Sequence, residues 1–285
     1  MIIVRLKGGL GNQMFQYAIG RKYMQMHNGN QVKLDDYTKK AGIQRDLMLT
    51  RYKIRGSVLN KPEYYIYRIT NALGTRVSFL KNWAYKIYFQ DQTHAYEDFY
   101  LQGGKNVYLD GFWQNLKYFD DIKEILKDEF QLKDAPTKYS QELLEKINNS
   151  NAICLHVRRG DYVSNSHTNS VHGTAPMDYY NNAIAYINSH VENPNYFLFS
   201  DDPDWAKENI KTNSPTEVSY NPIELGYEDL ALMNACKHYI IANSTFSWWG
   251  AYLSRNPNKI VCAPKRWYND KENPIDLIPE NWIKF

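Results

Sequence analysis

The second half of the chain alternates between short apolar runs and longer stretches with helical spacing of apolar residues. Short runs bounded by polar residues are typical of strands that are buried in a parallel sheet. Strands alternating with helices in this way predict βαβ units. The expected strands are Ala152–Leu155, Tyr196–Phe199, Glu217–Tyr220, Tyr239–Ala242 and Lys259–Ala263, and the expected helices are Lys138–Ile147, Met177–Val191, a short one around Trp205, Tyr227–Lys237 and Phe246–Ser254.

The first half begins with a clear pattern and then becomes less regular. Met1–Lys7 predicts a buried strand, which runs through the glycine-rich turn GGLGNQ into a helix. Such a turn presents backbone N–H groups to an anion, although a tight turn without a ligand explains it equally well. Arg76–Tyr100 fits a helix, a strand or an insertion. The other expected elements are the strands Gln31–Leu34 and Asn106–Phe112 and the helices Pro62–Leu73 and Phe119–Phe130.

A polar segment with turn signals separates these two halves. Gln131–Thr137 reads QLKDAPT and carries Pro136, which makes it the best candidate for a crossing between domains. We therefore predict an N-terminal α/β domain over residues 1–136 and a C-terminal α/β domain over residues 137–285.

Composition and charge exclude several classes of function. The formal net charge of +3 is too small, and basic runs are too few, to indicate a nucleic-acid partner. No apolar run approaches the roughly 20 residues that span a bilayer, and the N-terminus lacks a signal-peptide pattern. Three cysteines in apolar segments cannot all pair and predict buried thiols. These features predict a soluble cytoplasmic protein, with a peripheral association at the inner face of a membrane left open.

Polar side chains follow three predicted strands of the second half. In open α/β sheets, ligands bind beyond the carboxyl ends of the strands. An arginine fork suits phosphate recognition, whereas the alternative is an Arg–Asp ion pair that ties down a loop. Strand alternation separates Arg158, on the face of His156, from Arg159. The residues concerned are His156, Arg158, Arg159 and Asp161, then Ser200, Asp201 and Asp202, and finally Asn243, Ser244 and Thr245.

Four segments resemble motifs of one enzyme family. HVRRGDY at 156–162 closely resembles the HxRRGD motif of the α-1,2-fucosyltransferases, and FLFSDD at 197–202 fills the position of a further motif. GGLGNQMFQYA at 8–18 and NSTFSWWGAYL at 243–253 are similar to the N-terminal and C-terminal signatures. The resemblance implies a GT-B-type fold of two Rossmann-like domains with the active site in the cleft between them. It further implies GDP-β-L-fucose as donor and a galactose-terminated acceptor on the N-terminal side.

The resemblance also implies roles for the matching residues. Arg158 is expected to hold the pyrophosphate with Arg159 secondary, Asp161 to order the arginines, and Asp201 or Asp202 to contact guanine. The general base stays open among Asp161, His156, Asp35 and Asp36. The expected catalytic residues are His156, Arg158 and Asp161, and the expected donor-binding residues are Gly9, Gly11, Asn12, Gln13, His156, Arg158, Arg159, Asp201, Asp202, Asn243, Ser244, Thr245 and Phe246.

Two further expectations concern cofactors and competing functions. A DxD triplet at Asp202-Pro203-Asp204 resembles a metal site, but Asp204 is expected to cap the next helix, and the arginines supply the counter-charge. We therefore expect no metal and no cofactor. The alternatives are a GT-B transferase with another nucleotide sugar and a catalytically inactive glycan-binding module. The sequence indicates neither the acceptor nor the oligomeric state.

Overall fold

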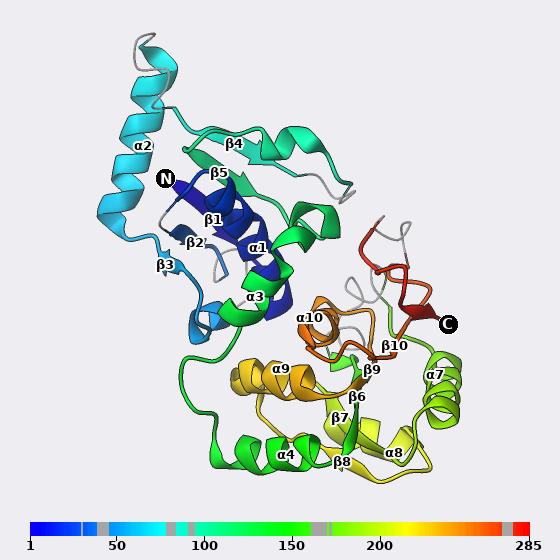
Figure 1. Ribbon diagram of the computed structural model, residues 1–285. Helices are drawn as coiled ribbons and strands as arrows, with labels where there is room; N and C mark the ends of the chain where they lie inside the picture. The colour runs from blue at the N-terminus through cyan, green and yellow to red at the C-terminus, as the bar shows by residue number, and fades with distance from the viewer. Residues whose placement is uncertain are drawn as a thin grey trace. The chain divides into compact units, whose positions relative to one another are not determined.

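The computed structural model of the protein describes residues 1–29, 31–38, 46–77, 84–90, 95–160, 170, 173–269 and 276–285. The chain divides into two compact α/β units (Figure 1). The first is built from Met1–Phe130, and the second begins at Gln131 and includes Leu277–Phe285. The predicted division between residues 136 and 137 lies in the segment of the second unit that precedes its first helix.

The first unit contains a five-stranded parallel sheet. Its strand order is β3-β2-β1-β5-β4, and the register pairs Val4 of β1 with Leu34 of β2 and Leu109 of β5. Helix α1 packs so closely on the sheet that a Cβ at Gly20 would lie 2.5 Å from the Val4 side chain. The elements are β1 (Ile2–Leu6), α1 (Leu10–Met26), β2 (Val32–Asp36), β3 (Gly56–Val58), α2 (Lys61–Arg76), β4 (Lys86–Phe89), β5 (Val107–Asp110) and α3 (Lys123–Glu129), with the 3-10 turns η1 (Met48–Arg51), η3 (Asp98–Leu101), η4 (Leu116–Tyr118) and η5 (Asp120–Ile122).

The second unit contains a six-stranded parallel sheet of order β11-β10-β9-β6-β7-β8. Ile153, Leu155 and Val157 point from β6 into a core with Tyr179 and Ile184 of α7. The elements are α4 (Lys138–Asn148), β6 (Asn151–Val157), α7 (Met177–His190), β7 (Pro194–Ser200), α8 (Pro203–Asn209), β8 (Thr216–Val218), η6 (Ile223–Leu225), α9 (Gly226–Ala235), β9 (His238–Ile240), α10 (Thr245–Leu253), β10 (Val261–Ala263) and β11 (Ile283–Lys284).

The predicted alternation of strands and helices is confirmed in both units. The undecided stretch Arg76–Tyr100 contains β4 and η3 within its described residues. The predicted helix Phe119–Phe130 is shorter than expected, because η5 replaces its first turn and α3 begins only at Lys123. Strands β3 and β11 were not predicted from the sequence.

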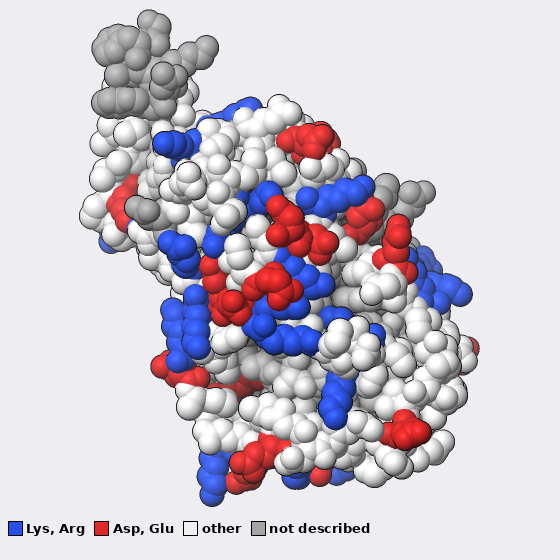
Figure 2. Space-filling view, in the orientation of Figure 1, with Lys and Arg blue, Asp and Glu red and all other residues white. Residues whose placement is uncertain are grey.

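Three global expectations can be compared with the described residues. Cys154, Cys236 and Cys262 are free and buried, as predicted. Among the described residues, every helix is too short or too polar to cross a bilayer. On the face drawn in Figure 2, Lys and Arg are interspersed with Asp and Glu.

Candidate functional site

The three polar segments of the second unit lie at one edge of its sheet. Strands β9, β6 and β7 are parallel neighbours, with Leu155 opposite Ile240 and Val157 opposite Ser200. The residues that follow them in the chain therefore emerge at the same carboxyl edge. This is the edge at which open α/β sheets bind ligands.

Arg158 and Asp201 connect two of these strand ends. The Nη1 atom of Arg158 lies 2.9 Å from Oδ2 of Asp201, and the backbone N–H of Arg159 donates to Oδ1 of the same carboxylate at 2.8 Å. A Cβ at Gly160 would lie 2.5 Å from that Oδ2 atom, so the close approach requires glycine. The Arg–Asp pair that the sequence offered as an alternative is thus present.

The side chains of Arg158 and Arg159 contact different aspartates. The guanidinium carbon of Arg159 lies 3.6 Å from the ring centroid of Trp205, a stacked cation–π contact with α8. Its Nε atom lies 3.5 Å from Oδ2 of Asp202, an ion pair rather than an aligned hydrogen bond. The side chain of Asp202 is 42% exposed, against 14% for Asp201. Asp202 is therefore the carboxylate that is more accessible to a ligand.

His156 is a buried polar group at this edge. Its ring lies 5.8 Å from that of Phe246, and among the described residues its Nδ1 atom has no hydrogen-bond partner. The pKa of His156 is lowered to about 3, chiefly by burial; the Asp201 carboxylate opposes this shift, and the Arg158 cation adds to it. The imidazole is therefore neutral at pH 7 and is a weak base.

The third segment forms the start of α10. Ser244 is the N-cap, and its hydroxyl accepts from the backbone N–H of Phe246 at 3.3 Å. Asn243 is buried and donates to the carbonyls of Gly173 and Trp267. Thr245 and Phe246 are half-buried in the first turn. The helix N-terminus gives this edge a partial positive charge.

Asp161, the remaining predicted catalytic residue, lies outside the described residues. Its role in ordering the arginines therefore stays a prediction. In the structure the side chain that contacts both Arg158 and the backbone of Arg159 is that of Asp201.

The glycine-rich turn of the first unit links β1 to α1. Gly8 has a φ of +80°, and Gly9 is the N-cap of α1, with open space where a Cβ would stand. The amide of Gln13 is fully buried, donates to the carbonyls of Gly8 and Asp46 and accepts from the N–H of Leu49. Gln13 therefore braces the turn. Gly11 is buried in the first turn of α1.

A second loop of the first unit reaches the same turn. Trp113 follows β5 with a φ of +56°, a conformation that is unfavourable for a bulky residue. The loop places Nε2 of Gln114 3.0 Å from Oδ1 of Asn12. Sequence analysis did not connect this loop with the glycine-rich turn.

Sequence analysis also missed an ionic cluster at the carboxyl edge of this sheet. Nη1 of Arg5 and Nζ of Lys7 contact the two oxygens of Asp110 at 2.8 and 2.7 Å. Tyr108 donates to Asp35 and accepts from Nε of Arg5. The signal in the sequence was a charged residue at position 5 inside an apolar strand. Of the other base candidates, Asp36 accepts from the backbone N–H and hydroxyl of Thr38.

The DxD triplet has a different local structure from that expected. Asp202 is the N-cap of α8, Pro203 occupies its first turn, and Asp204 follows within that turn. The prediction that Asp204 caps this helix is wrong, because the fixed φ of Pro203 suits the first helical position and moves the cap to Asp202. Among the described residues, no cluster of three His, Cys, Asp or Glu side chains could hold a metal ion.

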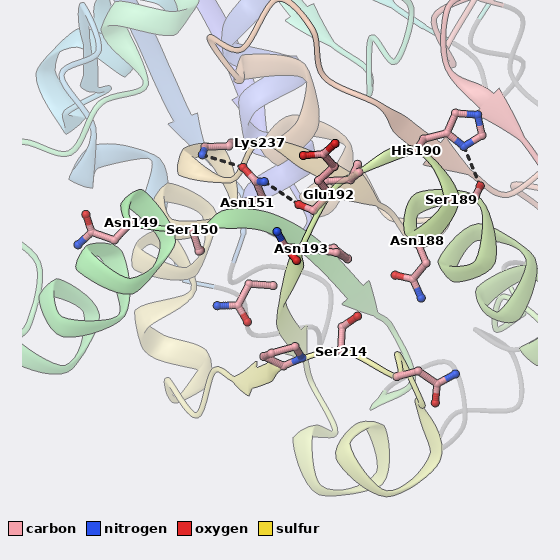
Figure 3. A pocket seen from close by; sticks show the side chains of 15 residues that line it. Asn149, Ser150, Asn151, Asn188, Ser189, His190, Glu192, Asn193, Ser214 and Lys237 are labelled. Atoms are coloured by element: carbon pink, nitrogen blue, oxygen red, sulfur yellow. Dashed lines mark hydrogen bonds between the residues drawn. The ribbon is translucent and has the colours of Figure 1, made fainter.

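A polar hollow lies at the opposite edge of the second sheet. Its lining comes largely from the segments that precede β6, β7, β8 and β9, including Asn149, Asn193, Ser214 and Lys237. Figure 3 shows Asn151 within it, donating to the carbonyl of Glu192 at 2.7 Å and accepting from Lys237 at 3.2 Å. The hollow is therefore separate from the arginines and the start of α10.

Comparison with known proteins agrees with this arrangement. The chain is 33% identical to an alpha-1,2-colitosyltransferase of Escherichia coli, over 100% of this chain and 98% of that protein. It is 26% identical to a galactoside 2-alpha-L-fucosyltransferase of Caenorhabditis elegans, over 65% of this chain and 52% of that protein. The crystal structure of POFUT1 in complex with GDP-fucose matches with a TM-score of 0.51 at 13% identity, covering 92% of this chain and 97% of that one.

The structural match and the two parallel α/β units confirm the predicted GT-B-type fold. The family model described as glycosyl transferase family 11 matches residues 1–284, almost the whole sequence. The matched range covers the arginine motif, both aspartates and the glycine-rich turn. The chain therefore belongs to glycosyl transferase family 11.

Proposed function

We propose that this glycosyltransferase transfers L-fucose from GDP-β-L-fucose to the 2-hydroxyl of a galactose residue in an acceptor glycan, with inversion and without a metal ion. The observation that carries the proposal is the edge of the second sheet, where Arg158, Arg159 and the start of α10 concentrate positive charge. The 1,2-linkage is supported by two relatives, a colitosyltransferase and a fucosyltransferase, which are both named for transfer to a 2-position although they transfer different sugars.

The donor contacts follow from the geometry of this edge. Arg158 contacts Asp201 through Nη1, and its planar guanidinium with five N–H donors has the geometry that suits a pyrophosphate. The backbone N–H groups at the start of α10 supply further donors. The more exposed Asp202 would accept from the N1–H and amino group of guanine, while Asp201 fixes the arginine loop. The neutral His156, Asn243 and Phe246 would lie against the nucleotide.

The chemistry follows from where charge develops. As the bond between fucose and phosphate breaks, negative charge accumulates on the leaving GDP and the sugar becomes oxocarbenium-like. Cationic and N–H donors that are already oriented stabilise that charge more in the transition state than in the ground state. The acceptor hydroxyl attacks from the opposite side, which inverts a β-linked donor into an α-linked product. A pKa of about 3 makes His156 a weak general base.

The acceptor is proposed to bind the first unit. Its sheet edge combines the carboxylates of Asp35 and Asp110 with aromatic rings, and the guanidinium of Arg5 lies 4.6 Å from the ring centroid of Tyr37. Carboxylates accept hydrogen bonds from sugar hydroxyls, and aromatic faces pack on the C–H surface of a sugar. The open space at Gly9 lets a ligand approach the glycine-rich turn closely.

A second donor is favoured by one observation. The colitosyltransferase matches the full length of this chain at 33% identity, whereas the fucosyltransferase of Caenorhabditis elegans matches 65% of it at 26%. Colitose is L-fucose without the 3-hydroxyl. The two donors therefore differ by one hydroxyl group, which the donor site would have to recognise.

One experiment separates these functions. The full chain is incubated with GDP-fucose or GDP-colitose and with lactose, N-acetyllactosamine or a galactose-containing polysaccharide repeat, and released GDP is measured. Transfer of fucose to a galactoside, with an α-1,2-linkage in the NMR spectrum, supports the proposal. Preference for GDP-colitose supports the second donor. Glycan binding without release of GDP from any donor would indicate an inactive glycan-binding module.

A further inference from the structure

Helix α2 of the first unit carries apolar residues on two opposite faces. Its inner face packs on the sheet, where the ring of Tyr67 lies 4.8 Å from that of Tyr85 and 5.2 Å from that of Tyr108. Gly74 is buried on the same side, and Asn71 accepts from the backbone N–H of Tyr85. The inner face is therefore fully accounted for by packing within the unit.

The opposite face is apolar and exposed. Tyr65, Ile66, Ile69 and Leu73 are between 40 and 63% exposed. Ile66, Ile69 and Leu73 are spaced by three and four residues, and Tyr65 lies four residues before Ile69, which places all four in one stripe. We call these four residues the outer stripe of α2. Single exposed apolar residues are ordinary on protein surfaces, but a continuous stripe indicates an interaction site. Figure 2 shows the side of the unit that carries α2 with mostly uncharged residues on view.

The exposed charges of α2 itself have one sign. Lys61, Arg68 and Arg76 are exposed on α2, whereas its one carboxylate, Glu63, takes part in the N-terminal capping box and lies 2.5 Å from Lys33 of β2. The guanidinium of Arg68 lies 5.9 Å from the ring centroid of Tyr64. An apolar stripe bordered by cations and aromatic rings matches the boundary between anionic head groups and acyl chains.

We propose that the outer stripe of α2 binds the surface of an anionic lipid bilayer, with Lys61, Arg68 and Arg76 at the level of the phosphates. The helix has 16 residues, too few to span about 30 Å of hydrocarbon, so it would lie along the interface. A second copy of the chain fits the stripe less well. Pairing of two stripes would bring the cations of both copies together without a free carboxylate of α2 to offset them.

The test is flotation of the full chain with vesicles of phosphatidylcholine, with and without phosphatidylglycerol. We expect binding only to the anionic vesicles, weakening as salt rises. Ile66→Ser with Ile69→Ser should lower the partition coefficient at least about tenfold, since apolar burial is lost. Arg68→Gln with Arg76→Gln should lower it about 25-fold, since each cation near the surface contributes about fivefold.

Matched controls lie on the second unit. Ile223 is 60% exposed, and Lys138 is an exposed cation of α4, so Ile223→Ser and Lys138→Gln should bind vesicles like the wild type. All variants should keep the wild-type melting temperature and turnover of soluble substrates. The proposal is overturned if the wild type ignores anionic vesicles or if the α2 variants still float. It is equally overturned if the wild type is a dimer that the isoleucine double substitution converts to monomers, which would make the stripe a subunit interface.

Discussion

Nη1 of Arg158 lies 2.9 Å from Oδ2 of Asp201, so the cation proposed to hold the diphosphate already has a carboxylate partner. The pair joins the ends of β6 and β7, because Asp201 also accepts from the backbone N–H of Arg159. The carboxylate thereby fixes the direction of the guanidinium before a ligand binds. A preoriented cation contributes more to transition-state stabilisation than a mobile one.

The two arginines should differ when each is changed to lysine. Arg158→Lys keeps the charge but cannot contact Asp201 and a phosphate at the same time with a planar fork, so we expect kcat to fall about 10²–10³-fold. Arg159→Lys loses the stacked contact with Trp205 and should cost less. Steady-state release of GDP measures both, with circular dichroism as the folding control. A larger loss at Arg159 would mean that the two roles are reversed.

The two aspartates should separate guanine recognition from loop positioning. Asp202→Asn should weaken GDP binding by about 1.5–3 kcal/mol, since a charged hydrogen-bond partner of the base is lost. Asp201→Asn should lower kcat more than GDP affinity, because it loosens Arg158. Calorimetry with GDP and steady-state kinetics provide the two measurements. Equal GDP affinities in the two variants would contradict the assignment.

How much of the fold was predictable depended on the kind of strand. Strand β6 was predicted because its residues Ala152–Leu155 form a continuous apolar run, which is typical of strands buried on both faces. Strand β3, Gly56–Val58, has no such run and is defined by its hydrogen bonds to β2. Strand β11 has two residues and is defined by its pairing with β10. Edge strands of this kind follow from tertiary pairing, which a local pattern does not contain.

The candidate site was predictable to a similar extent. The sequence placed His156, Arg158 and Asp201 at one sheet edge, because parallel strands end together. It did not reveal which carboxylate each arginine contacts, since that depends on rotamers and on the tight approach at Gly160. Gln13 was expected to bind the donor, but its amide is occupied within the unit by Gly8, Asp46 and Leu49.

Removal of divalent metal should leave activity nearly unchanged. Arg158, Arg159 and the start of α10 would provide positive charge where Mn²⁺ or Mg²⁺ serves in metal-dependent transferases. Initial rates are compared in excess EDTA and with added Mn²⁺. A large loss in EDTA that Mn²⁺ restores would contradict metal independence.

The buried His156 should make the stability of the protein depend on pH. Its pKa is about 3 in the folded chain, against an ordinary value of 6.5, so below pH 6.5 the unfolded chain binds a proton that the folded chain does not. Stability from this group is therefore complete above pH 6.5 and is lost as the pH falls toward 3. The free energy of unfolding should fall by up to about 1.4 kcal/mol per pH unit, which gives a total loss of about 2 kcal/mol at pH 5.

His156→Asn isolates that contribution, because the amide does not titrate. We expect the wild type to lose about 2 kcal/mol more than the variant between about pH 7 and pH 5, measured by urea unfolding. Because the imidazole is neutral throughout this range, titration of His156 should not produce a break in kcat of the wild type near pH 6.5. Parallel pH dependence of stability in the two proteins, or a break in kcat that disappears in His156→Asn, would show that the imidazole titrates normally in the folded chain.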